Sequence, residues 1–431
     1  MIYAIPEQIG ILACPGAAGF AVKLTADLEE VSQRKFRRKV GYLAQKYGIS
    51  REEIIRRINL TLDLRPTTVD LTLPVDQFRP PSFRVPVQFT RFANGEYKAE
   101  ILTSIRNMDI YIVQDVENHY PIPLNKGDED TFELSVNDHF FCLLVSIDAA
   151  LQAGAKRITA VLPTYPYARQ HKKQGREALV AARLGQFLEF AGVERIITLD
   201  IHSKEIDNSF NRLRLEDLHG SYQILRALST IVDLQSPDLV IISPDTGSIV
   251  RNKFYANTLS KSLGMLYKER DYSYASKDAR HNNITNVRLL GSVEGKTVFM
   301  ADDMLGTGGT MLRAMSTLKS MGAKRIICAA SLPLFSGGAI EAFDEAYREG
   351  LFFRFIGTNA VYHDQNLLGR EWYVSTDIGY LFARVIYRLH SDRSLSSLLD
   401  NKKIIQSMLE KSKKPRPKKP SKPTDSSKAS P

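Results

Sequence analysis

The sequence between residues 84 and 400 alternates short apolar runs with amphipathic helical stretches. Seven runs rich in Ile, Val and Leu predict β-strands at Asp109–Gln114, Arg157–Leu162, Arg195–Leu199, Leu239–Ser243, Thr297–Ala301, Arg325–Ala330 and Phe353–Gly357. Helical periods lie between several of them, for example at 139–152, 176–191 and 310–321. This rhythm predicts an α/β fold in which helices cover both faces of mostly parallel sheets. Right-handed crossovers would place functional groups at the carboxyl ends of the strands.

The two halves of this zone share a layout in which a strand is followed by an acidic or Gly-rich turn and then by a helix. We therefore expect two α/β domains, at residues 85–225 and 226–400, rather than one large sheet. Residues 1–84 precede them as an extension of unassigned role, and a Pro-rich segment marks the boundary. Helices are expected in this extension near 27–46 and 51–59. A DNA-reading helix–turn–helix and a simple packed pair are both open.

The charge of the chain is concentrated at its C-terminal end. The chain has 58 Lys and Arg against 48 Asp and Glu, a formal charge of +10. Residues 411–431 hold eight Lys or Arg and one Asp, a net of +7, and they contain no large apolar side chain. We expect residues 401–431 to form a disordered basic tail. It would either keep the protein soluble or contact nucleic acid or another acidic surface, and we expect such contacts through the tail only.

Three observations bear on the location of the protein. No run of about 18 uncharged apolar residues occurs, so no membrane span is expected. The N-terminus lacks the basic region of a secretion signal. Cys14, Cys142 and Cys328 are too far apart for a zinc spacing and do not form a disulfide framework. A cytoplasmic location is expected.

The segment Thr297–Thr310 predicts a sugar-phosphate site. An apolar strand ends in Asp302 and Asp303, and a Gly-rich turn leads into a helix. Glycines let the backbone approach an anion, and the free N–H groups of the helix start would point at it. Two carboxylates beside the turn suit the vicinal hydroxyls of a polyol, because they accept hydrogen bonds. The residues expected to hold the phosphate are Thr307, Gly308, Gly309 and Thr310.

This loop resembles the phosphoribosyl-binding signature of type I phosphoribosyltransferases and of ribose-phosphate pyrophosphokinases. Four other segments resemble the pyrophosphokinase family in particular, and the resemblance covers about residues 84–400. They are RFANGEYKAEI at Arg91–Ile101, VLPTYPYARQHKK at Val161–Lys173, ITLDIHSKEI at Ile197–Ile206 and VIISPDTGSIVRNKFYA at Val240–Ala256.

The resemblance implies which residues bind ATP. Phe92 would stack on the adenine, and Glu96 would accept a hydrogen bond from its amino group. Arg169 and Gln170 match residues of the family that contact ATP. The family assembles with its sites near subunit boundaries, so a homo-oligomer is implied as well.

The resemblance also implies a metal site and a pyrophosphate loop. His202 and Asp245 would hold Mg²⁺, and Asp200 matches the acidic residue that precedes this histidine in the family. The loop that faces the pyrophosphate would be completed by Thr246, Gly247 and Ser248.

The segment that contains Lys268 and Arg270 resembles a flexible catalytic arm of the family. These two cations are two residues apart, so on a strand both would project from one face. They could stabilise the negative charge that spreads over a transferring phosphoryl group. Together with Arg169 and Arg251, they are the basic residues expected beside the phosphate loops.

The implied reaction transfers the β,γ-diphosphoryl group of ATP to the 1-hydroxyl of ribose 5-phosphate, giving PRPP and AMP. Two positions depart from the family: Gly306 and His171 each stand where an Asp is usual. They leave open a catalytically weak or silent regulatory paralogue. A phosphoribosyltransferase is a further alternative, although the duplicated α/β layout and the segment with Arg169 and Gln170 count against it.

Overall fold

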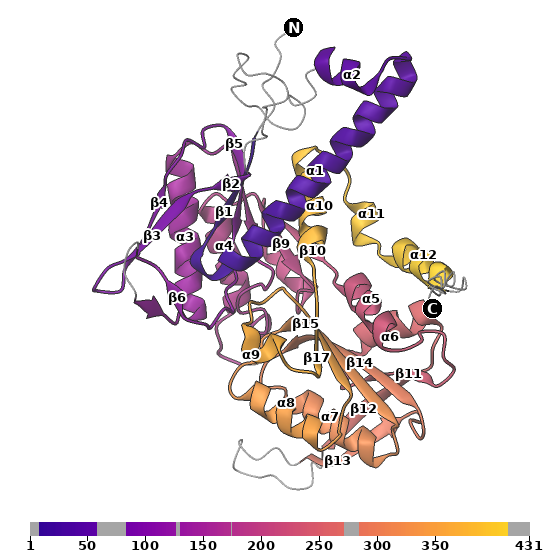
Figure 1. Ribbon diagram of the computed structural model, residues 1–431. Helices are drawn as coiled ribbons and strands as arrows, with labels where there is room; N and C mark the ends of the chain where they lie inside the picture. Colours follow the sequence, from indigo (N-terminus) through magenta and orange to yellow (C-terminus); the bar gives the residue numbers. More distant parts are fainter. Residues whose placement is uncertain (1–7, 58–82, 126–129, 174, 271–283, 413–431) are drawn as a thin grey trace, which may run out of the picture.

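The computed structural model describes residues 8–57, 83–125, 130–173, 175–270 and 284–412 (Figure 1). It contains two larger sheets, one in each half of the chain, and helices lie on both of them. All seven predicted strands are present, as β5 (Met108–Val113), β8 (Arg157–Val161), β9 (Arg195–Leu199), β11 (Leu239–Ser243), β14 (Thr297–Leu305), β15 (Arg325–Pro333) and β16 (Arg354–Thr358). The expected two α/β units are confirmed.

The N-terminal sheet has six strands in the order β10-β9-β8-β5-β1-β2, and every neighbouring pair is parallel. Strands β5, β8 and β9 are buried along nearly their whole length, as expected for parallel strands covered on both faces. The other elements of this unit are β1 (Gln8–Ala13), β2 (Arg84–Val85), β10 (Arg214–Leu218), α3 (Val136–Gln152) and α4 (Val180–Phe190).

The N-terminal unit begins earlier than the predicted boundary at residue 85. Strand β1 lies between β5 and β2, with Gln8 opposite Met108 and Ala13 opposite Val113. A run of six residues, QIGILA, is too short for periodicity alone to identify as a strand. Part of the predicted extension is thus a component of the first sheet.

Two helices follow β1, close to the predicted positions. Helix α1 (Ala18–Tyr47) packs on α10 (Gly379–His390), and the rings of Phe20 and Phe382 meet edge to face at 5.5 Å. Beyond this contact, α1 projects from the body of the molecule and carries α2 (Arg51–Arg57) at its end (Figure 1). The two helices pack through a small cluster around Val40 and Ile54.

The C-terminal sheet has seven strands in the order β13-β12-β11-β14-β15-β16-β17, and only the pair β12–β13 is antiparallel. Alternate residues of β11 enter two different cores: Val240 and Ile242 join one, whereas Leu239 and Ile241 join the other. The elements that complete this unit are β12 (Leu263–Arg270), β13 (Ile284–Leu290), β17 (Tyr373–Thr376), α5 (Ser221–Ile231), α6 (Ile249–Leu259), α7 (Gly309–Ser320), α8 (Ala339–Arg348) and α9 (Gln365–Leu368).

The region predicted as a disordered tail begins with ordered structure. Helix α12 (Lys402–Ser412) follows α11 (Ser396–Leu399), and Ile405 of α12 is fully buried in the core that also contains α5 and α6. The prediction of disorder from residue 401 is therefore wrong for this segment, because its apolar residues find a complementary surface on the folded domain. Residues 413–431 lie outside the described part of the chain.

The remaining elements are small. Among the described residues, no helix combines the length and apolar composition needed to cross a membrane. The small elements are the hairpin β3 (Val87–Arg91) and β4 (Tyr97–Ile101), the pair β6 (Ile122–Pro123) and β7 (Thr131–Phe132), and the 3₁₀ helices η1 (Pro15–Ala17) and η4 (Lys204–Ser209).

If β1 is a structural strand, truncating its core side chain must destabilise the whole N-terminal unit. Leu12 has no exposed surface, so Leu12→Ala should lower the free energy of unfolding by about 3 kcal/mol in urea denaturation. The matched control Val22→Ala removes an apolar side chain that is 55% exposed on α1, and it should change the free energy by less than about 0.5 kcal/mol. Equal effects of the two variants would contradict the placement of β1.

Candidate active site

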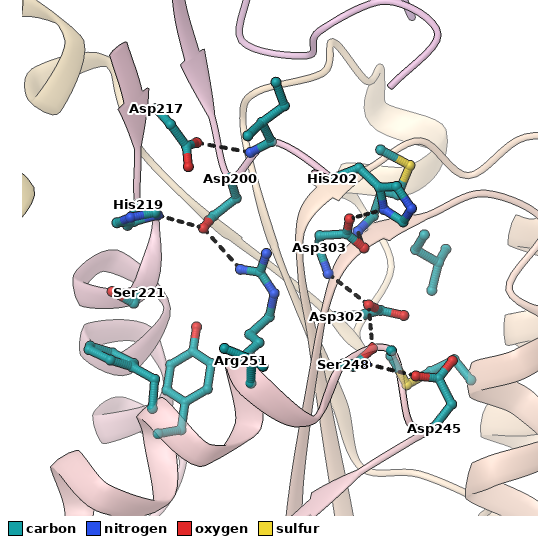
Figure 2. Close-up of a pocket in the computed structure, with 18 of the residues that line it drawn as sticks. Asp200, His202, Asp217, His219, Ser221, Asp245, Ser248, Arg251, Asp302 and Asp303 are labelled. Carbon is teal, nitrogen blue, oxygen red and sulfur yellow. Dashed lines mark hydrogen bonds and ion pairs between the residues drawn. The ribbon is translucent and has the colours of Figure 1, made fainter. Parts of the chain in front are cut away.

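A cavity of about 850 Å³ lies where the carboxyl ends of strands from both sheets meet. Figure 2 shows carboxylates and histidines from several elements directed toward one another in this region. The predicted site residues that line the cavity are Arg169, Asp200, His202, Asp245, Gly247, Ser248, Arg251, Asp302, Asp303, Thr307, Gly308, Gly309 and Thr310.

The predicted phosphate loop has the required backbone geometry. Strand β14 continues to Leu305, and α7 begins at Gly309 after Gly308, which has φ of +75°. A Cβ at Gly308 would lie only 2.4 Å from Cε2 of Phe343, so the backbone conformation and the close packing both require glycine. No side chain caps this helix start. Its first N–H groups are therefore available to an anion.

Gly306, one of the two departures from the family pattern, lies beside Arg169. A Cβ built on Gly306 would be 3.3 Å from Nη1 of Arg169. The guanidinium therefore reaches the start of the phosphate loop from the N-terminal unit. The other departure, His171, packs its ring edge to face against His202 at 5.2 Å.

The two adjacent carboxylates of β14 have different surroundings. Asp302 accepts hydrogen bonds from Ser248 Oγ at 2.7 Å and from the N–H of Asp303 at 2.9 Å. Asp303 pairs through Oδ2 with Nδ1 of His202 at 2.6 Å (Figure 2). Burial and the neighbouring Asp303 raise the pKa of Asp302 to about 7. Burial also opposes ionisation of Asp303, but the His202 hydrogen bond and the charge of Arg251 hold its pKa below the ordinary value.

Asp200 connects the two units at the inner wall of the cavity. It follows β9, has φ of +43° and is 5% exposed. Its carboxylate accepts from Nδ1 of His219 at 3.1 Å and from the N–H of Gly220 at 3.0 Å. From the C-terminal unit, Nη1 of Arg251 lies at 3.0 Å and Ser331 Oγ at 2.5 Å. Burial disfavours the charge, but Arg251 and the hydrogen bonds lower the pKa of Asp200 far below its ordinary value.

The cavity does not bring His202 and Asp245 into one metal cage. Asp245 accepts the N–H of Ser248 at 2.9 Å, whereas His202 is paired with Asp303. In the described part of the chain, no three His, Cys, Asp or Glu residues form a group that could hold a metal ion. The carboxylates are nevertheless hard oxygen donors, and Mg²⁺ is commonly bound by one or two of them together with phosphate oxygens. The residues present therefore fit Mg²⁺ carried with a nucleotide, not a fully protein-bound ion.

Several predicted residues are not brought to the cavity. Phe92, which is 45% exposed, and Glu96 lie at the β3–β4 turn and do not line it. Gln170 and Thr246 are also absent from its lining. Lys268 and Arg270 belong to β12, but their side chains lie outside the described part of the structure.

The cavity also has a wall that the sequence did not predict. Asn401 donates through Nδ2 to the carbonyl of His219 at 3.0 Å and to Ser221 Oγ at 3.1 Å. Asp217, whose pKa burial raises to about 6, accepts the N–H of Ile201 at 2.9 Å. These residues have no motif spacing, so only the fold brings them to the phosphate loop. The unpredicted lining comprises Ile201, Lys204, Asp217, His219, Ser221, Val250, Phe254, Tyr255, Met304, Leu305, Gly306, Met311, Leu399, Asp400, Asn401 and Lys402.

Comparisons with known proteins agree with this geometry. Residues 82–192 match the N-terminal domain of ribose phosphate pyrophosphokinase, and residues 211–351 match the phosphoribosyl transferase domain. Ribose-phosphate pyrophosphokinase A of Dictyostelium discoideum is 31% identical over 314 residues, which cover 73% of this chain and 89% of that protein. The chain belongs to the ribose-phosphate pyrophosphokinase family. The predicted resemblance is thereby confirmed.

Other pyrophosphokinases are similar to this chain to the same degree. Ribose-phosphate pyrophosphokinase 2 of Schizosaccharomyces pombe is 32% identical over 313 residues, covering 72% of this chain and 88% of its own. The fold is similar to the crystal structure of phosphoribosylpyrophosphate synthetase from Mycobacterium smegmatis, with a TM-score of 0.63 and 24% identity. That match covers 90% of this chain and 100% of the other. The shared fold thus extends beyond the ranges of the two family models.

Replacement of Asp302 should stabilise the protein above neutral pH. Folding raises its pKa from 3.8 to about 7, so the unfolded chain loses this proton first and stability falls as the pH rises through this range. Asp302→Asn removes the effect and should raise the free energy of unfolding at pH 8 by more than about 1 kcal/mol. Urea denaturation should show a smaller gain at pH 5. A gain that is the same at both pH values would contradict the assigned cause.

Replacement of Asp200 should destabilise the protein, in contrast to replacement of Asp302. Asp200→Asn leaves the guanidinium of Arg251, which is 21% exposed, without its ion-pair partner and should cost about 3 kcal/mol of folding free energy. Combining it with Arg251→Met removes the unpaired cation, so the double variant should regain part of that loss in urea denaturation. If the two substitutions were additive, the pair would not be the stabilising contact.

Proposed function

We propose that this protein transfers the β,γ-diphosphoryl group of ATP to the 1-hydroxyl of ribose 5-phosphate, with PRPP and AMP as products. The observation that carries the proposal is one cavity that joins the phosphate loop, the carboxylates of β14, the Asp245 loop and Arg169. A sugar phosphate and a polyphosphate need adjoining anion sites of this kind. The names of the relatives agree with this reaction, and they do not favour a silent paralogue or a phosphoribosyltransferase.

The sugar phosphate is assigned to the end of the cavity formed by β14 and α7. Its 5-phosphate would be held by the N–H groups of Gly308 and Gly309 and by the hydroxyls of Thr307 and Thr310. Its 2- and 3-hydroxyls would donate to Asp302 and Asp303. His202 supports this role, because its hydrogen bond favours the ionised, accepting form of Asp303.

The triphosphate is assigned to the part of the cavity next to the sugar-phosphate site, between Arg169 and the Asp245 loop. Arg169 reaches the phosphate loop beside Gly306 and would contact the phosphate chain, with Gln170 nearby in the sequence. The loop of Thr246, Gly247 and Ser248 would face the pyrophosphate, although Ser248 already donates to Asp245 and to Asp302. Phe92 and Glu96 would bind adenine from a neighbouring copy of the chain, because they do not line the cavity of their own subunit. A homo-oligomer follows from this assignment.

Catalysis would rest on positioning and electrostatics. When bound together with the nucleotide, Mg²⁺ would offset the charge of the phosphates; Asp245 and His202 are the residues that would each contribute to holding it, without forming a shared cage. Lys268 and Arg270, at the end of β12, would stabilise the charge on the transferred group. The three cysteines are free and buried, which suits the reducing cytoplasm where we expect the protein.

The reaction can be tested by AMP release. Purified full-length protein with Mg²⁺ and ATP should release AMP only when ribose 5-phosphate is added. Asp303→Asn should lower kcat/KM for ribose 5-phosphate by about 10- to 100-fold, because it removes a charged hydrogen-bond acceptor, while the KM for ATP should change little. Lys268→Ala should lower kcat with little effect on either KM.

The controls decide between an active enzyme and a silent one. AMP release by the wild-type chain that does not exceed that of Lys268→Ala would overturn the proposed function. Equal losses toward ATP and ribose 5-phosphate in Asp303→Asn would instead overturn only the assignment of the sugar site.

A further inference from the structure

A cluster of positive charge lies away from the active site, where α1 packs against α10. Five of the six residues in the segment 34–39 of α1 are Lys or Arg, and no Asp or Glu occurs from Val31 to Arg51. Helix α10 and the turn after it add three arginines. We call this cluster the cationic surface; its members are Arg34, Lys35, Arg38, Arg384, Arg388 and Arg393.

The six charges act on one another, although they come from segments about 350 residues apart in the sequence. Burial lowers the pKa of Lys35, and the charges of Arg393, Arg38 and the α10 arginines lower it further. Burial likewise lowers the pKa of Arg384, and Arg388 and Arg34 add to the effect. The fold therefore keeps these six cations close together although they repel one another.

The partners of these cations are neutral. Arg34 donates through Nη1 to the hydroxyl of Tyr380 at 2.8 Å, and Arg388 donates to the carbonyl of Ser394 at 2.6 Å. Within the described residues, none of the six forms an ion pair with a carboxylate, whereas Arg157 and Arg251 each pair with a buried aspartate. Because no carboxylate of the described residues is ion-paired with these cations, an anion from outside would relieve their mutual repulsion.

The shape of the surface favours an extended anion that also carries rings. Arg34, Arg38 and Tyr42 are four residues apart, so they follow one another along one face of α1 at steps of about 6 Å. The side chain of Tyr42 is 63% exposed. A row of cations that ends in an exposed aromatic ring is typical of surfaces that bind single-stranded nucleic acid, because bases stack on the ring while phosphates contact the cations.

An acidic membrane fits this surface less well. Membrane-bound helices insert apolar side chains beside their cations. Val31 is instead buried in the core of the N-terminal unit, and Val40 is buried in the small cluster between α1 and α2. We propose that the cationic surface binds the phosphate backbone of a single-stranded nucleic acid and that Tyr42 stacks on one of its bases.

This interaction would be separate from the proposed catalysis. In the part of the chain that the structure describes, the lining of the active-site cavity includes no residue of α1 or α10. Substitutions on the cationic surface should therefore leave ribose 5-phosphate-dependent AMP release unchanged, which also provides a check that the variants fold.

The test measures binding of the full-length chain to a fluorescently labelled, single-stranded RNA of about 20 nucleotides as a function of salt. In the triple variant Arg34→Gln, Lys35→Gln, Arg38→Gln, the slope of log K against log salt should become less steep by about 2. The reason is that each lost phosphate contact lowers the magnitude of this slope by about 0.7. Tyr42→Ala should weaken binding by about 10-fold while the slope stays the same, because stacking releases no counterions.

A matched triple variant controls for net charge. Lys319→Gln, Lys324→Gln and Arg348→Gln remove three exposed charges from the C-terminal unit, and this variant should bind RNA with a slope close to that of the wild type. Deletion of residues 413–431 separates any contribution of the basic terminal segment, and the effect of the α1 variant should persist in that background.

Three results would overturn the proposal. The first is equal losses in the α1 and control variants, which would indicate only a net-charge effect. The second is binding that depends on residues 413–431 and not on the cationic surface. The third is binding to vesicles containing phosphatidylserine that requires the cationic surface, without binding to RNA.

Discussion

The buried charge of Asp200 is the interaction on which the active-site region depends most. It belongs to the N-terminal unit, yet Arg251 and Ser331 contact it from the C-terminal unit. A carboxylate this deeply buried is tolerated only with charged and hydrogen-bonding partners. The position of α6, which carries Arg251, is therefore tied to the end of β9, and His202 lies two residues farther along the chain.

Two adjacent carboxylates show how function and stability oppose each other in this site. Asp302 and Asp303 follow a buried strand and share a partly desolvated space, so both cannot ionise freely. His202 and Arg251 favour the charge on Asp303, and this charge in turn raises the pKa of Asp302. The proposed role of these carboxylates, to accept hydrogen bonds from a sugar, requires this arrangement, although neutral residues would give a more stable protein.

Much of the fold and part of the site could be predicted from the sequence. The strands of both sheets and the Gly308 turn are encoded by contiguous patterns, because periodicity and glycine geometry act on neighbouring residues. Strand β1 and helix α12 were missed because each is a short apolar segment whose conformation depends on a distant surface. The predicted metal ligands are a different case: His202 and Asp245 both line the cavity, but no local pattern indicates that His202 is engaged by Asp303.

The sequence by itself determined the two α/β units, the Gly-rich turn between β14 and α7, and the family. These features depend on residues close together in the chain. Only the tertiary structure decided which charges meet: His202 with Asp303, 101 residues apart, Asp200 with Ser331, 131 residues apart, and the cations of α1 with those of α10. The physical reason is that local patterns specify backbone conformation, whereas contacts between distant elements depend on how their surfaces pack and on which charges that packing leaves without a partner.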